Sequence, residues 1–284
     1  MTNLMATAKE MLYQRMIQHN TLLCCGLDPD LHRLPAEVFS QKGTDEEKTL
    51  QFLQGVVDVT AEHVCAYKVQ KAFFDLLPGG HDVLKSIIAY THTNYAGIPV
   101  IVDCKVGDID NTMAAYIENI LDAMGADGIV VNPYMGDDVL QPVAKLSDKL
   151  VVVLVRTSNP GSSIVQDALM IDGRALWQHI LDLVVNRWST NGNMVVVLSA
   201  TAGMDLAAVR TTIPDNTPIL LAGVGAQGGS YADLRSLLNS QKSGVFVNSS
   251  RAVLYPDNPI GIPWGEAIRN VAIELKAKLN EQRR

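Results

Sequence analysis

The chain reads PVIVDC over residues 99–104, a β-branched run that is followed at once by Lys105. The apolar character of this run is continuous rather than alternating, which is typical of a parallel strand covered on both faces. Similar runs recur at intervals of roughly 20 to 45 residues, at 22–26, 65–70, 128–132, 150–156, 194–199, 218–222 and 244–248. The sequence therefore predicts eight buried parallel strands.

The segments between these runs carry apolar residues at helical spacing. In 46–64, Leu50, Leu53 and Val57 recur at three- and four-residue steps, which places them on one helix face. Similar stripes predict helices at 83–96, 113–124, 175–189, 232–238 and 263–279, and a first helix over 4–19 precedes the first strand. Strands alternating with helices, with no Pro/Ser-rich linker or internal repeat, predict one domain over 1–284, a closed (β/α)8 (TIM) barrel. A doubly wound open sheet is the alternative architecture.

The composition excludes several classes of protein. The chain has 23 Lys and Arg against 30 Asp and Glu, a net charge of −7, and so lacks the basic balance of a nucleic-acid-binding protein. No apolar run approaches the roughly 18 to 20 residues that span a bilayer. Lys9, Glu10 and Arg15 interrupt the N-terminal region, which therefore does not read as a secretory signal. We expect a cytoplasmic protein that binds neither nucleic acid nor a membrane.

The cysteines and histidines give no indication of a metal site. Cys24, Cys25, Cys65 and Cys104 show no CxxC spacing, and three of them lie in strongly apolar runs. They are predicted to be reduced thiols packed as small hydrophobic side chains. The six histidines are scattered along the chain, so we expect no metal.

Charged residues stand at the carboxyl ends of the predicted strands, where a (β/α)8 barrel carries its active site. Alternate residues of a strand face the same side, so Asp103 and Lys105 should both point into the barrel mouth. Lys68 and Asp28, at two other strand ends, would complete a cluster of alternating charge. Because buried charges are costly unless paired, this cluster indicates a function. A structural ion pair at the rim and a solvated Lys68 are the alternatives.

A glycine-rich loop, GVGAQGG, occupies residues 223–229 after the strand at 218–222. Backbone N–H groups at the start of a helix can hold a phosphate, and the loops after the last two strands of such barrels commonly do so. Arg251, just past the eighth strand, offers a guanidinium for bidentate phosphate contact. The loop matches GxGxxG, but it comes late and no acidic strand end follows, so a dinucleotide fold is disfavoured. A simple turn beside a surface arginine is the alternative.

Residues 158–163 read SNPGSS, a polar and turn-rich stretch after the strand at 150–156. Loops of this composition often act as lids over active sites. No GxSxG motif or partnering histidine accompanies it, so a nucleophilic serine is not expected. An ordinary surface loop is the alternative.

Together these residues resemble the orotidine 5′-phosphate decarboxylase family. Residues 103–112, DCKVGDIDNT, are similar to the family signature DxKxxDIxxT, and the resemblance runs from the GLD at 26–28 to Arg251. It implies a barrel enzyme that decarboxylates orotidine 5′-monophosphate to UMP in pyrimidine biosynthesis. It also implies that no cofactor and no metal takes part.

The resemblance further implies a role for each matching residue. The family's catalytic array of alternating charge would consist of Lys68, Asp103, Lys105 and Asp108. Lys105 would donate the proton to C6 of the pyrimidine. Asp28 and Lys68 would hold the ribose hydroxyls. Asp108 and Thr112 would reach into the site of a neighbouring subunit, so the resemblance implies a homodimer with shared active sites.

The remaining matches concern the base and the phosphate. Ser158 would read the pyrimidine amide, Gln227 would bridge the phosphate and the base, and Arg251 would clamp the phosphate. Ser250 departs from the family pattern, because many relatives have glycine before the arginine, although its backbone N–H can still donate to the phosphate. The segment 160–177 does not align with the family pattern.

Two other functions fit parts of the pattern. Magnesium-dependent sugar-phosphate decarboxylases or aldolases on the same barrel share the DxKxxD motif but need an added acidic ligand. Glu62 and Glu118 lie on predicted helices and do not supply one at a strand end. A nucleotide-binding barrel without chemistry is the other alternative, and it is disfavoured because every charged member of the array is present.

Overall fold

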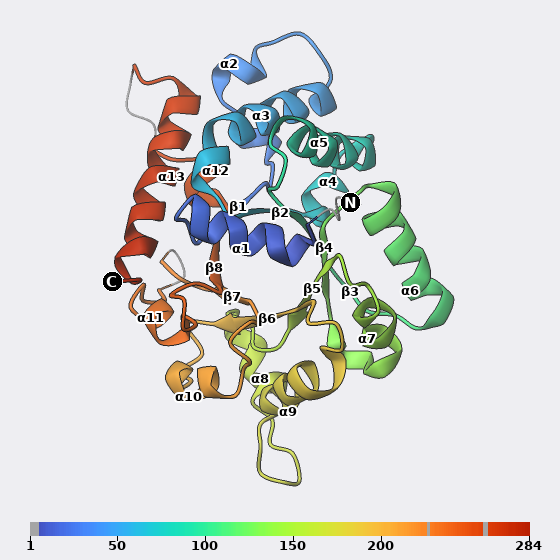
Figure 1. Cartoon of the computed structure of the whole chain (residues 1–284). Helices are drawn as coiled ribbons and strands as arrows, with labels where there is room; N and C mark the ends of the chain where they lie inside the picture. The colour runs from blue at the N-terminus through green and yellow to red at the C-terminus, as the bar shows by residue number, and fades with distance from the viewer. Residues whose placement is uncertain (1–5, 226–227, 258–260) are drawn as a thin grey trace, which may run out of the picture.

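The computed structural model describes residues 6–225, 228–257 and 261–284. Parallel strands close into a barrel in chain order, with β8 paired to β1 (Figure 1). The strands are β1 (Leu23–Gly26), β2 (Ala66–Gln70), β3 (Val100–Val106), β4 (Gly128–Val131), β5 (Leu150–Leu154), β6 (Met194–Ser199), β7 (Ile219–Ala222) and β8 (Val245–Ser249). The closed (β/α)8 barrel expected from the sequence is confirmed, and the open doubly wound sheet is excluded.

The strands form where β-branched runs can be covered on both faces. β4 and β6 are buried throughout, and β5 is buried in all but its last residue. The observed strands begin and end within two residues of the predicted runs. β3 is irregular, since its register against β4 shifts between Val102 and Val106.

Helices of different lengths surround the barrel. Those foreseen from the periodicity are α1 (Ala8–Gln18), α3 (Asp45–Thr60), α5 (Gly80–Asn94), α6 (Asp110–Ile117), α9 (Leu176–Leu183), α11 (Asp233–Leu237) and α13 (Trp264–Glu281). π-Helical turns extend α6 and α9 as η3 (Glu118–Ala123) and η6 (Val184–Trp188). α7 (Asp137–Ala144) and α10 (Leu206–Thr211) were not predicted; α7 contains Pro142, which lacks the N–H of a regular helix. Across the described ranges, no helix combines the length and the apolar character needed to cross a membrane.

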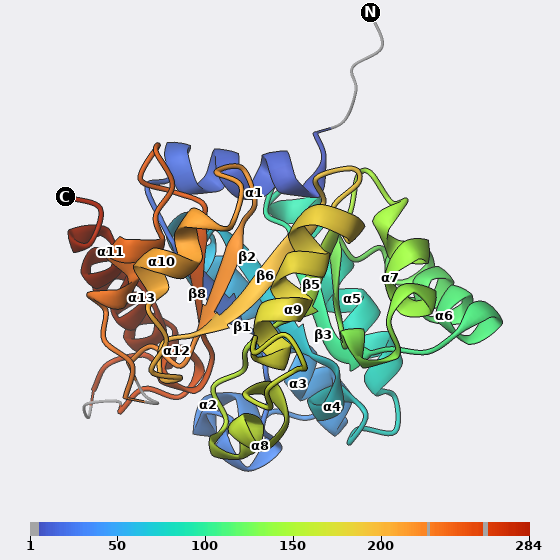
Figure 2. The same cartoon turned by 90° about the horizontal axis from the view of Figure 1, so that it is seen from below.

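The two ends of the barrel differ in what covers them (Figure 2). α1 lies across the end where the strands begin and buries Leu12 and Met16. Its Arg15 donates to the carbonyls of Ala61 and Val64, which fixes α1 to the turn before β2. The short helices α2 (Ala36–Phe39), α4 (Lys71–Phe74), α8 (Ser163–Gln166) and α12 (Arg251–Leu254) follow strand ends or flank the opposite end. The carboxyl ends of the strands are therefore left for a site.

Candidate active site

Three charged side chains from β2 and β3 meet at the carboxyl end of the barrel. Lys68 Nζ donates to Asp103 Oδ2 at 2.8 Å, and Lys105 Nζ donates to Asp103 Oδ1 at 2.7 Å. Gln70 lies opposite Asp103 in the strand register. With its amide nitrogen turned toward the carbonyl of Asp103, Gln70 accepts from Lys105 Nζ at 3.1 Å. The structure thus brings together the lysines and the carboxylate that the sequence placed at the mouth, and it adds Gln70, which sequence reasoning missed.

Burial and charge act in opposite directions on this cluster. Lys68 and Asp103 are 6% and 7% exposed, whereas the side chain of Lys105 is 45% exposed. Burial alone would lower the pKa of Lys68, but Asp103 and Asp28 hold that pKa above its ordinary value. Burial alone would raise the pKa of Asp103, but Lys68 and Lys105 hold it below its ordinary value. The buried pair therefore stays charged, and Lys105 is the member of the cluster that is open to a ligand.

The backbone of Lys105 has an unusual conformation. Its φ is +47°, in the left-handed region that non-glycine residues rarely adopt. The residue lies where the register of β3 shifts against β4, and such irregularities re-aim side chains near active sites. Simple strand alternation is therefore an incomplete account of why Lys105 meets Asp103. Local strain of this kind persists where the surrounding structure fixes it, and it clusters at functional sites.

Asp28 connects β1 to the charged cluster. Its Oδ1 accepts from the backbone N–H of Gln70 at 3.1 Å, and its charge acts on Lys68. Gly26, at the end of β1, leaves room for Ser250, because a Cβ at position 26 would lie 1.9 Å from Ser250 Oγ. Asn248 Nδ2 donates to the same hydroxyl at 3.1 Å. The side chain that distinguishes Ser250 from a glycine is thus accommodated against Gly26 and Asn248.

A cavity of about 390 Å³ lies beside the first and eighth strands and the loop after the seventh, and it shares Asp28, but neither lysine nor Asp103, with the charged cluster. Its lining includes Asp28, Gly223, Ser250 and Arg251. Gly223 has a φ of +84°, and its carbonyl accepts from the N–H of Gly229 at 2.9 Å, which closes the glycine-rich loop on itself. The predicted phosphate loop and the predicted arginine clamp therefore flank one cavity. Gln227, predicted to bridge phosphate and base, lies outside the described residues.

Asp108 and Thr112 lie apart from the cluster within this chain. Asp108 Oδ1 accepts from the adjacent backbone N–H of Ile109 at 2.8 Å. Thr112 is exposed on α6, and Ile109 beside it is 42% exposed. In the part of the chain that is described, neither Asp108 nor Thr112 has a hydrogen bond or an ion pair with the Lys–Asp–Lys cluster. Their predicted roles depend on a second subunit.

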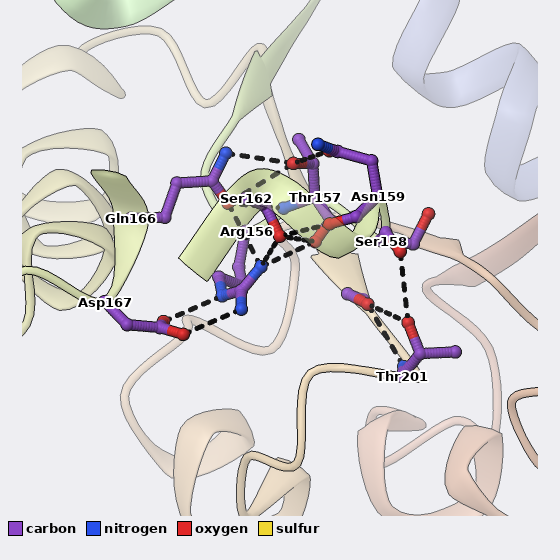
Figure 3. Close-up of polar contacts among 9 residues, drawn as sticks. Arg156, Thr157, Ser158, Asn159, Ser162, Gln166, Asp167 and Thr201 are labelled. Carbon is purple, nitrogen blue, oxygen red and sulfur yellow. Dashed lines mark hydrogen bonds and ion pairs between the residues drawn. The ribbon is translucent and has the colours of Figure 1, made fainter. Parts of the chain in front are cut away.

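Ser158 follows β5, at the start of a loop that is held by Arg156 (Figure 3). Ser158 is half-buried, and a Cβ on Gly223 would approach its Cβ to 3.0 Å. The predicted base-reading residue therefore lies next to the predicted phosphate loop. Arg156 carries no motif, and sequence reasoning gave it no role. Among the described residues there is no group of three or more His, Cys, Asp and Glu side chains that could hold a metal ion.

Comparison with known proteins matches residues 21–261 to the family described as "Orotidine 5′-phosphate decarboxylase / HUMPS family". The chain belongs to this family. It is 40% identical to the orotidine 5′-phosphate decarboxylase of Janthinobacterium sp. (strain Marseille), over 92% of this chain and 93% of that protein. It is also 40% identical to the one of Ralstonia pickettii (strain 12J), over 94% and 95%. The family resemblance seen in residues 103–112 is confirmed.

Solved structures of the family have the same architecture. That of Leishmania donovani OMP decarboxylase superimposes with a TM-score of 0.81 at 31% identity, covering 98% of this chain and 99% of that one. Near-complete coverage of both chains means that the barrel and its flanking helices match as a whole. The orotidine 5′-phosphate decarboxylase fold is therefore shared from end to end.

Proposed function

We propose that this chain decarboxylates orotidine 5′-monophosphate to UMP in pyrimidine biosynthesis, as a carboxy-lyase. Membership of the orotidine 5′-phosphate decarboxylase family and relatives at 40% identity support the activity. The observation that carries the chemistry is the Lys68–Asp103–Lys105 cluster, in which a buried ion pair holds a more exposed ammonium at the mouth. A cytoplasmic location is part of the proposal.

The chemical difficulty of this reaction is the electron pair left on C6 when the bond to the carboxylate breaks. Fixed charges aimed at the place where charge develops are effective, because they need no reorganisation during the reaction. The ammonium of Lys105 would stabilise the C6 carbanion and then donate a proton to it as CO₂ leaves. Lys105 would regain its proton from water after the product departs. The balance needs no oxidant and no reductant.

Asp103 and Lys68 would hold Lys105 in place for this proton transfer. Asp103 accepts from both ammonium groups at 2.7 and 2.8 Å, so its carboxylate fixes the position of Lys105 Nζ. Gln70 contributes a further acceptor at 3.1 Å. Asp103 would also lie near the departing carboxylate of the substrate. Lys68 and Asp28, which lie close to each other, would bind the ribose hydroxyls.

The remote phosphate would supply binding energy for the reaction at C6. Arg251 and the glycine-rich loop flank the same cavity and would hold the phosphate there, with Gln227 bridging it to the base. The backbone N–H of Ser250 would add a donor, while its hydroxyl lies against Gly26 and accepts from Asn248 Nδ2. Ser158, beside Gly223, would read the pyrimidine amide.

The working unit would be a homodimer with shared sites. Asp108 lies outside its own chain's cluster, and Thr112 is exposed on α6, as side chains that reach a neighbouring subunit would be. Chains carrying Lys105→Ala and chains carrying Asp108→Ala should each be inactive alone. After mixing and reassembly they should regain about a quarter of the wild-type activity, because half of the dimers are mixed and each has one intact site. No recovery would count against the shared site.

The activity itself is tested by the absorbance change that follows addition of orotidine 5′-monophosphate to metal-free protein. We expect turnover by the wild type with EDTA present, and a loss of about a thousandfold or more in Lys105→Ala. Lys85→Ala is the matched control, because Lys85 is exposed on α5. Near-normal turnover by a folded Lys105→Ala protein would refute the assignment. No turnover of orotidine 5′-monophosphate, together with turnover of a sugar phosphate that EDTA abolishes, would instead favour a magnesium-dependent sugar-phosphate enzyme.

A further inference from the structure

Arg156 is a buried cation just after β5, and each of its guanidinium nitrogens has a hydrogen-bond partner (Figure 3). It is 4% exposed. Its Nε and Nη2 donate to the two carboxylate oxygens of Asp167 at 2.9 Å each. Its Nη1 donates to the carbonyl of Thr157 at 2.7 Å and also contacts Ser162 Oγ and Gln166 Oε1. A buried guanidinium is tolerated where its N–H groups are paired in this way, so this cation ties both ends of residues 157–167 together.

The backbone on either side of Ser158 is fixed by side chains. Gln166 Oε1 accepts from the N–H of Thr157 at 2.9 Å, while Arg156 occupies the carbonyl of the same residue. Thr201 Oγ1, from the loop after β6, donates to the carbonyl of Ser158 at 3.4 Å. These contacts come from three separate places in the chain. They leave the main chain at Ser158 little freedom.

The side chain of Ser158, in contrast, is left free. Within residues 6–225, 228–257 and 261–284, its hydroxyl has no hydrogen-bond partner. Its Cβ packs beside Gly223 in the phosphate loop. A held backbone with an unbonded hydroxyl is the arrangement expected of a group that is kept ready for a ligand.

Apolar packing does not account for the order of this loop. Ile164 and Val165, on α8, are 82% and 52% exposed. A loop with so little apolar burial must have its ordering entropy offset by polar contacts. Arg156 and its partner Asp167 make the largest set of such contacts here.

We propose that Arg156 is a positioning residue for the reaction: paired with Asp167, it holds residues 157–167 so that the Ser158 hydroxyl is presented to the pyrimidine. The proposal rests on the proposed function. It assigns to Arg156 no contact with the substrate. Its effect is confined to the part of the ligand that Ser158 reaches, the base, and does not extend to the phosphate.

The test compares Asp167→Asn and Arg156→Lys with the wild type. Asp172→Asn is the matched control, since Asp172, five residues beyond Asp167, also pairs with an arginine at 2.8 Å, but its partner Arg174 is exposed whereas Arg156 is buried. We expect kcat/KM for orotidine 5′-monophosphate to fall about tenfold to a hundredfold in the two test variants, as misplacement of a positioning group does. UMP should bind more weakly to them, whereas the Kd of ribose 5-phosphate, which lacks the base, should stay unchanged. The control should match the wild type in every measurement.

A second readout uses no substrate. Backbone amide exchange in residues 157–167 of the ligand-free protein should speed up about tenfold or more in Asp167→Asn and stay unchanged in Asp172→Asn. The proposal is overturned if exchange does not change, or if UMP and ribose 5-phosphate lose affinity equally, because that is the result of a general structural role. If the two variants show the expected exchange pattern but the wild type does not turn over orotidine 5′-monophosphate, the proposed function is refuted instead.

Discussion

Asp103→Asn should show how much the charge of Asp103, as distinct from the size of its side chain, contributes to the stability of the fold. The substitution keeps the size of the side chain but removes the charge that lies between Lys68 and Lys105. Lys68 is 6% exposed and would lose its direct partner. Removing one member of a buried ion pair costs about 3 to 5 kcal/mol. Asp28 still acts on Lys68, so we expect the lower end of this range, about 3 kcal/mol.

This loss translates into a shift of the melting temperature. The entropy of unfolding is about 2.1 cal/mol/K per residue, or about 0.6 kcal/mol/K for a chain of 284 residues. A loss of about 3 kcal/mol therefore lowers Tm by about 5 °C. Glu274→Gln is the control, because the Glu274–Lys278 pair on α13 is exposed and its removal should leave Tm almost unchanged.

The pH dependence of the difference gives a second check on Asp103→Asn. Because the pKa of Asp103 lies below its ordinary 3.8, its contribution is present above that value and is lost as the pH falls through the folded pKa. Because the pKa of Lys68 lies above its ordinary 10.5, its contribution is present below that value and is lost as the pH rises through the folded pKa. Calorimetry should thus find a constant difference between these limits. A loss under about 1 kcal/mol at neutral pH would refute the buried pairing.

Three further outcomes are expected. Arg251→Ala should lower kcat/KM for orotidine 5′-monophosphate about a hundredfold, because a charged hydrogen-bond pair to the phosphate is lost. Steady-state kinetics should show no such loss with phosphate-free orotidine. Equal losses with the two substrates would contradict the predicted phosphate clamp. Gly26→Ala should destabilise the fold by about 1 to 3 kcal/mol, because its methyl would lie 1.9 Å from Ser250 Oγ. Thermal unfolding should show that adding Ser250→Gly restores stability in the double variant. Additive losses of stability would argue against the clash. Burial and the charge of Arg15 hold the pKa of His19 below its ordinary 6.5. The stability that His19 contributes is therefore present above pH 6.5 and is lost as the pH falls through the folded pKa. The free energy of unfolding measured in urea should therefore change less with pH between about 7 and 5.5 in His19→Gln than in the wild type. The same change of this free energy with pH in both proteins would refute the prediction.

The strands could be predicted because they are continuous apolar runs, which are typical of a parallel sheet covered on both faces. The runs at 128–132 and 194–199, for example, became β4 and β6 almost unchanged. The helices that escaped prediction carry weaker local signals. α7 contains Pro142, and α10 is only six residues long. Packing against the barrel, which no local pattern reports, stabilises both of them.

The part of the candidate site that could be predicted consists of charged residues at the carboxyl ends of strands. Lys68, Asp103 and Lys105 stand at such ends, and the structure joins them. Gln70 was missed although it lies on the same side of its strand as Lys68, because an uncharged amide gives no signal of burial cost. Arg156 was missed because its partner Asp167 comes from a loop whose fold depends on contacts that no motif encodes.

The left-handed backbone of Lys105 has a consequence for how this chain can change. Glycine is the residue that would adopt a φ of +47° without penalty, yet glycine carries no ammonium group. Evolution toward a more stable barrel and evolution toward faster chemistry would therefore pull this single position in opposite directions. An engineer who ranks substitutions by thermal tolerance alone would be guided toward discarding the proposed proton donor.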